Sequence, residues 1–257
     1  SAIVCLITGA VLCVILFCSA NLLLRLVDTK PVFIGGATQY LKIYAFGMPA
    51  LALYNFGNGV LSAAGDTKRP LIYLAVAGVI NILLNLFFVI VCKLDVAGVA
   101  IASITSQYIS AILIFISLLK NKGGASVRWK YLKITPEKAK KILGLGLPGF
   151  QNSIFSIANL FIQKAVNYFD ETFFNGNTAA ANADALIYDL LAAYYTACSS
   201  FMGQNFGAGK KDRMRASYRI SLIYSFGTGL IAGGLLLTFG RQFLSIFTKN
   251  PAEIEDG

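Results

Sequence analysis

The chain has 257 residues and a formal net charge of +10; 56% of the residues are hydrophobic, only 13% are charged, and the mean hydropathy is +0.67. Soluble domains carry about a quarter charged residues, so this composition excludes a soluble enzyme and predicts a protein embedded in lipid. The absence of histidine excludes His-based catalysis and His-ligated metal sites.

Seven stretches are each long and apolar enough to cross a bilayer, which requires about 20 mostly apolar residues. They cover residues 2–24, 43–65, 70–92, 96–119, 142–163, 178–209 and 220–240. We therefore predict an all-α integral membrane protein with seven transmembrane helices. Pro49 and Pro148 lie within two of these stretches and predict kinks, because proline removes a backbone donor and clashes with the preceding turn.

The placement of the basic residues predicts the orientation. If the amino end lies in the cytoplasm and the spans alternate, 15 of the 22 lysines and arginines fall in inner loops. Basic inner loops are the rule in membrane proteins, so this orientation is favoured and no nucleic-acid partner is needed to explain the charge. Residues 121–141 are expected to form a basic cytoplasmic linker, with an amphipathic helix over 136–145 lying on the membrane surface as an alternative.

No cofactor or metal site is predicted. Residues 144–149 and 207–211 look like nucleotide-binding loops, but the first has no preceding strand and the second lacks a glycine and a Ser or Thr that the motif needs. The 5 cysteines lie in apolar runs, where a thiol packs as a small hydrophobic group.

Polar side chains inside the spans are the candidates for function, because an unpaired polar group in hydrocarbon costs several kcal/mol. Asn81 and Asn85 lie four residues apart and therefore on one helix face, either lining a cavity or bonding to a neighbouring helix. Gln151 in the fifth span, and Gln107 with Tyr108 in the fourth, are further polar positions.

The sixth span contains two carboxylates. With Thr178 as the N-cap, Asp184 lies about 9 Å and Asp189 about 17 Å along the helix, so Asp189 approaches the bilayer midplane. The two differ by about 140° around the axis, and Asp184 shares a face with Tyr188. An intramembrane carboxylate indicates a proton or cation site, and a structural ion pair with Lys164 is the alternative.

Several segments resemble the multidrug and toxic compound extrusion (MATE) transporters. Residues 40–49 (YLKIYAFGMP) and 61–70 (LSAAGDTKRP) are similar to the family's fourth helix and the loop after it, which includes Gly65 and Asp66. Residues 203–209 (GQNFGAG) resemble a second loop motif, with Gly203, Gln204, Gly207 and Gly209. Residues 81–85, 96–100 and 146–148 also resemble the family, in its order.

This resemblance implies a twelve-helix parent with two lobes, of which the seven spans would be helices three to nine. Residues 1–120 would be a partial amino-terminal lobe with four helices, and 142–257 a partial carboxyl-terminal lobe with three. The parent would be a monomer in the cell membrane that exports organic cations or amphipathic drugs in exchange for Na⁺ or H⁺, and the fragment alone would be inactive.

The resemblance also implies roles for particular residues. Asn81 and Asn85 match asparagines of the family's fifth helix, next to its amino-lobe cation site. Acids that many members carry on other helices are absent, which leaves Asp184 and Asp189 as the intramembrane acids. A flippase for lipid-linked sugars from the same superfamily is the main alternative function, and a seven-helix receptor is a weaker one.

Overall fold

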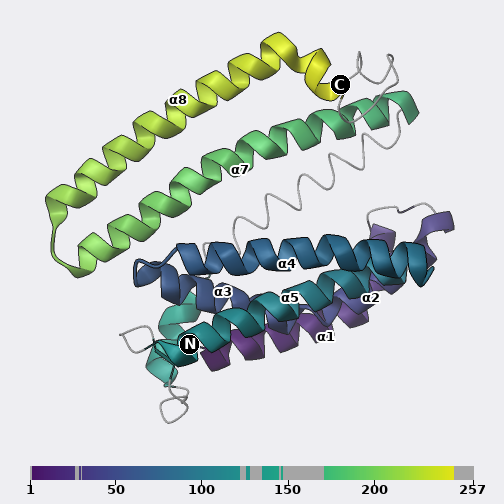
Figure 1. Cartoon of the computed structure of the whole chain (residues 1–257), viewed down its shortest axis with the longest axis horizontal. Coiled ribbons are helices and arrows are strands. Elements are labelled where there is room, and N and C mark those ends of the chain that lie inside the picture. Colours follow the sequence, from purple (N-terminus) through teal and green to yellow (C-terminus); the bar gives the residue numbers. More distant parts are fainter. Residues whose placement is uncertain are drawn as a thin grey trace. The chain divides into compact units, whose positions relative to one another are not determined.

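The computed structural model describes residues 2–26, 29, 31–121, 126–127, 135–144, 146 and 171–245, and all regular structure in these residues is helical. The all-α class is therefore confirmed for the described part of the chain. The chain forms two compact units, 1–156 and 157–257, and each is described by itself. The first unit contains α1 (Ala2–Leu26), α2 (Pro31–Ala45), α3 (Met48–Ala63), α4 (Lys68–Leu86), the π-helix η1 (Phe87–Val91) and α5 (Asp95–Lys120) (Figure 1). The second contains α7 (Glu171–Gly207) and α8 (Lys211–Leu244).

Among the described residues, 4 helical segments have the length and apolar composition of a membrane span: α1, α4 continued by η1, α5 and α8. These correspond to the predicted spans over 2–24, 70–92, 96–119 and 220–240. Most of the predicted span over 142–163, including Pro148 and Gln151, lies outside the described residues. The number of seven transmembrane helices therefore stays a prediction.

The predicted span over 43–65 is divided between α2 and α3. The backbone N–H of Gly47 donates to the carbonyl of Tyr44 over 2.8 Å in a tight turn, and α3 begins at Met48 with Pro49 in its first turn. The break predicted at Pro49 is confirmed, and its cause is the missing N–H and the bulk of the proline ring. The helix before the break begins at Pro31, earlier than the apolar pattern indicated.

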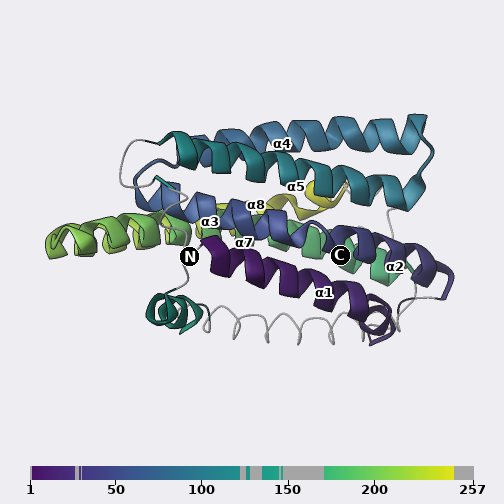
Figure 2. The same ribbon diagram turned by 90° about the horizontal axis from the view of Figure 1, so that it is seen from below.

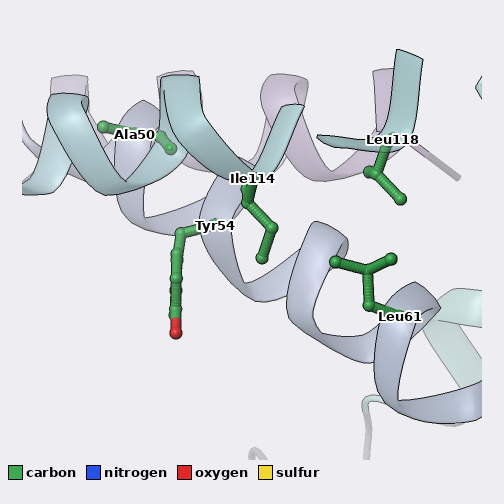
Figure 3. Close-up of a cluster of buried hydrophobic side chains, with 6 residues drawn as sticks. Ala50, Tyr54, Leu61, Ile114 and Leu118 are labelled. Atoms are coloured by element: carbon green, nitrogen blue, oxygen red, sulfur yellow. The ribbon is translucent and has the colours of Figure 1, made fainter. Parts of the chain in front are cut away.

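In the first unit, α5 packs against α2, α3 and α4, while α1 packs against α2 and α3 (Figure 2). The buried core between α3 and α5 consists of Ala50, Tyr54, Leu61, Ala111, Ile114 and Leu118. In Figure 3 the side chain of Ile114 points from α5 toward α3, between Tyr54 and Leu61. The helices approach closely there, since a Cβ on Gly57 would lie only 2.8 Å from Ile114 Cγ2. Small residues commonly allow such close packing of membrane helices.

Large apolar side chains remain exposed along the outer helices. On α4, the exposed fraction is 67% for Leu71 and 61% for Ile82. Lipid can solvate such side chains where water cannot, so this surface agrees with a membrane location.

In the second unit, α7 and α8 run side by side as a helical hairpin joined by a short turn (Figure 1). The turn contains Gly209, whose φ of +71° lies in the region that favours glycine. The two helices are linked further along by a hydrogen bond of 2.8 Å between the hydroxyls of Tyr194 and Thr228.

Candidate functional site

A pocket of about 400 Å³ lies between α2, α4 and α5 in the first unit. Its lining combines aromatic rings, amides and hydroxyls, and it includes no charged side chain among the described residues. The lining residues are Tyr40, Tyr44, Leu74, Ala77, Gly78, Asn81, Ser103, Ser106, Gln107 and Ser110. Polar groups in such number are unusual within membrane helices and mark this pocket as the candidate site.

Asn81 is the centre of a hydrogen-bond chain beside this pocket. Its amide nitrogen donates to Ser106 Oγ on α5 over 3.3 Å. Its amide oxygen accepts a bond of 3.1 Å from Asn85 Nδ2, one turn further along α4. The i,i+4 spacing thus places both asparagines on one face, as predicted. The structure combines the two readings that the sequence left open, because Asn81 both lines a cavity and bonds to a neighbouring helix.

Gln107 joins the pocket to the break between α2 and α3. Its Nε2 donates to the hydroxyl of Tyr44 over 3.1 Å, and a Cβ on Gly47 would collide with its Oε1. The next residue, Tyr108, donates from its hydroxyl to the carbonyl of Phe46 over 3.0 Å. That carbonyl lies in the break, where helical backbone bonds are interrupted, so a side chain from α5 satisfies it.

Two amide oxygens near the pocket are buried without a hydrogen-bond partner among the described residues: Asn85 Oδ1 and Gln107 Oε1. Leaving a buried acceptor unpaired costs about 1–3 kcal/mol, so such atoms call for an explanation. Both are neutral oxygen acceptors, which suit a small hard cation or a ligand that donates hydrogen bonds.

Tyr40 and Tyr44 give the pocket an aromatic wall. Their rings are stacked, with centroids 5.7 Å apart and an angle of 13° between the planes. The two residues are one turn apart on α2, so helical geometry accounts for the stacking. The π-faces of tyrosine attract organic cations and pack against flat aromatic molecules.

A π-helical segment follows directly after the asparagines. In η1 the N–H of Cys92 bonds to the carbonyl of Phe87, five residues earlier, over 3.1 Å. Such segments are rare and occur frequently at functional sites. Here the segment ends the helix that carries Asn81 and Asn85. No pattern in the sequence predicts this segment.

The carboxylates lie on α7, in the second unit. This helix begins at Glu171, so Thr178 is inside it and is not the N-cap, contrary to our expectation. A cap preference is a local signal of about 1 kcal/mol and does not end a helix that can continue. The predicted distance of Asp189 from the start of the helix therefore does not hold, and α7 is not among the described helices with the composition of a membrane span, so the depth of Asp189 in the bilayer stays a prediction.

Asp184, Tyr188 and Asp189 are all exposed on α7. Neither carboxylate makes an ion pair with another described residue. Lys164, the partner considered for them, lies outside the described residues, as does Gln151. The structure therefore does not join these residues to the pocket of the first unit, and their roles stay predictions.

The two loop motifs form turns. Gly65, with φ of +89°, ends α3, and Asp66 accepts from the backbone N–H of Arg69 over 3.2 Å and pairs with its side chain at 3.1 Å. In the second motif, α7 ends at Gly207, and the N–H of Lys210 bonds to the carbonyl of Asn205 over 2.9 Å. Gly203 and Gln204 lie in the last turns of α7. Both motifs therefore set how one helix turns into the next.

The sequence compares closely with one protein family. A family model described as MatE matches residues 1–87 and 149–257. The chain is similar to a probable multidrug resistance protein, YpnP, of Bacillus subtilis, with 31% identity over 243 residues. The match covers 94% of this chain and 54% of YpnP, so the chain spans about half the length of that relative.

Solved structures agree in fold. A transporter of the MOP superfamily from Pyrococcus furiosus matches over 100% of this chain and 57% of its own, with a TM-score of 0.88 and 22% identity. A multidrug resistance MATE family transporter of the same superfamily, solved in an outward-facing conformation, gives the same TM-score, identity and coverage. At this identity the likeness establishes the fold alone.

Proposed function

The chain belongs to the MatE family, and from that premise we propose that it forms part of a membrane antiporter that exports organic cations or amphipathic drugs in exchange for Na⁺ or H⁺. The observation that carries the proposal is the polar, aromatic-walled pocket between α2, α4 and α5. We place the protein in the cell membrane as a monomer, with the amino end of the chain in the cytoplasm.

The drug would bind in this pocket against the faces of Tyr40 and Tyr44. Stacked rings and apolar side chains accept flat aromatic molecules of differing shape, and the ring faces attract positive charge. Gln107 Oε1 is buried against Gly47, and it would serve a drug amine or hydroxyl as an acceptor once the side chain turned toward the pocket. A volume of about 400 Å³ lies in the range of small-molecule sites.

The coupling ion would meet neutral oxygens in the first unit. Amides and hydroxyls such as those of Asn81, Asn85 and Ser106 do not bind a proton near neutral pH, whereas they can ligate a hard cation. This chemistry favours Na⁺ at the pocket. The carboxylates of Asp184 and Asp189 would be the proton-binding candidates, because a carboxylate near the bilayer midplane is readily neutralised.

Exchange requires that each ligand bind one conformation more tightly than the other. A ligand with equal affinity for both states shifts nothing, so the ion must favour the state from which the drug is released. Competition for the same acceptors would be a second requirement, because an ion held by Gln107 Oε1 or Asn85 Oδ1 removes an acceptor from the drug and prevents both from being bound together.

The flippase alternative is not favoured. A site for a lipid-linked pyrophosphate should carry basic side chains, whereas the described lining of the pocket is neutral. The multidrug resistance relative also argues against it, and against a receptor.

The test is ethidium efflux from cells that express the protein encoded by the complete gene, with Na⁺ and H⁺ gradients imposed separately. We expect efflux under one gradient, and that gradient identifies the ion. Absence of efflux under both, with the protein present in the membrane, would refute the proposed function. Asp184→Asn and Asp189→Asn are measured in parallel. If both variants export normally, the carboxylates are structural and coupling must lie elsewhere.

A further inference from the structure

A second pocket, of about 440 Å³, lies at the turn between α7 and α8 in the second unit, and it shares no lining residue with the pocket of the first unit. Its lining residues are Met202, Phe206, Lys211, Met214, Arg215, Tyr218 and Arg219. Three of these side chains are cations and four are apolar or aromatic. The two loop motifs and the proposed transport function do not explain why they line one pocket together. We propose that this pocket binds the headgroup and upper acyl chain of an anionic phospholipid.

The cations form one row. Lys211, Arg215 and Arg219 follow each other at intervals of four residues, so they share one face of α8 and extend over about 12 Å of its axis. No acidic residue lines the pocket, and none of the three makes an ion pair with a described residue. The row is therefore a concentration of positive charge without a partner in this part of the chain, and it complements a phosphate.

The depth of the row matches the headgroup layer. The apolar run of α8 begins at Ile220, directly after Arg219, so the cations end where the hydrocarbon region is expected to begin. A row at this level meets lipid phosphates, which attract juxtamembrane lysines and arginines.

The apolar side chains of the pocket favour a lipid over a free phosphate ion as its ligand. Phe206 is 74% exposed at the end of α7, and Tyr218 is 57% exposed on α8. Tyr218 lies two residues before the boundary at Ile220, where aromatic rings are typical of the membrane interface and contact the upper part of the acyl chains. Inorganic phosphate would gain nothing from Phe206, Met202 or Met214, whereas a phospholipid uses the charged and the apolar walls together.

The test measures lipid retention by native mass spectrometry of the complete protein, purified with equal amounts of phosphatidylglycerol and phosphatidylcholine of the same acyl chains. Arg215→Gln with Arg219→Gln removes two pocket charges. Lys210→Gln with Arg213→Gln removes two charges from the same turn and helix but outside the pocket lining. We expect the pocket variant to lose phosphatidylglycerol by about fivefold per charge removed, and the control variant to retain it.

Two further arms test the identity of the ligand. Phe206→Ser changes no charge and should also lower retention, and soluble glycerophosphoglycerol or inorganic phosphate should displace little lipid. If the two charge variants lost equal amounts of phosphatidylglycerol, the proposal would be overturned, because retention would then depend on the overall positive charge of this region and not on the pocket. If the soluble phosphates displaced bound phosphatidylglycerol as effectively as intact lipid does, the assignment of the ligand as a phospholipid would be overturned.

Discussion

Asn81 is the residue on which the candidate transport pocket depends most. Its amide bonds to Ser106 on another helix and to Asn85 on its own, so it uses both donor and acceptor in a site where water is scarce. Buried networks of this kind are rigid when complete and costly when broken. The chain thus holds one polar position in place beside the free acceptor of Gln107.

Gln107→Leu is expected to separate binding from stability. The substitution removes the hydrogen bond to Tyr44, which lowers the free energy of unfolding by about 1 kcal/mol. It also removes an unpaired buried oxygen, which raises the free energy of unfolding by a similar amount. The thermal stability of the ligand-free protein should therefore change little, while the stabilisation produced by added ethidium should largely disappear. Ile112→Leu, an exposed apolar position on the same helix, serves as the control. An undiminished ethidium shift in Gln107→Leu would contradict this role.

At the residue scale, the sequence predicted Asn81 and Asn85 correctly as neighbours because their spacing alone decides the helix face. It did not predict that Ser106 and Gln107 complete the pocket. Gln107 stood out as a polar residue in an apolar run, but serine is common in membrane helices, and contacts between α4 and α5 follow from packing that no local pattern contains.

The break between α2 and α3 is the feature of greatest interest at the scale of elements. Pro49 interrupts the helix, and Tyr108 and Gln107 of α5 hold the interrupted segment through Phe46 and Tyr44. A wall of the pocket therefore depends on how α5 fixes this break.

Tyr108→Phe should loosen the break without changing the fold. Loss of the bond to the Phe46 carbonyl is expected to cost about 1 kcal/mol. Amide hydrogen exchange of a peptide covering residues 43–51 should become faster, while a peptide from α4 should keep its rate. Unchanged exchange over 43–51 would show that Pro49 alone determines the break.

Gly57→Ala tests the close contact between α3 and α5. A Cβ at this position would meet Ile114 at 2.8 Å, so we expect a loss of about 1–3 kcal/mol in the free energy of unfolding. Ile114→Ala removes all three of the atoms that this Cβ would meet (Cγ2, Cγ1 and Cδ1), so it should cost less stability in the Gly57→Ala background than on its own. Gly59→Ala, where a Cβ meets nothing within 4 Å, is the matched control on the same helix. Equal thermal stability of the Gly57→Ala and Gly59→Ala variants would show that the contact does not limit packing.

Element positions were predictable where composition is strong. Long apolar runs located α1, α4, α5 and α8, and proline located the break at Pro49. The start of α7 was missed, because Thr178 is a good N-cap by type and yet the more polar segment before it is helical. Hydropathy indicates whether lipid or water surrounds a helix, and it does not determine at which residue the helix begins or ends.

At the scale of the whole molecule, the sequence motifs identified the family that the MatE match establishes. The order of motifs along the chain carried this identification, because each motif alone is short. The structure adds the pocket of the first unit and the basic pocket of the second, both of which depend on packing between helices.

The central claim is that the pocket around Asn81 is the transport site of an efflux antiporter, and one comparison tests it directly. Gradient-driven ethidium efflux is measured for the complete protein, for its Asn81→Leu variant and for its Ile82→Leu variant, all at matched membrane expression. Ile82 is the adjacent residue and lies on the exposed side of α4, so it serves as the control. We predict that Asn81→Leu abolishes efflux and that Ile82→Leu preserves it. Equal export by the two variants would contradict the account, because transport would then not require the pocket.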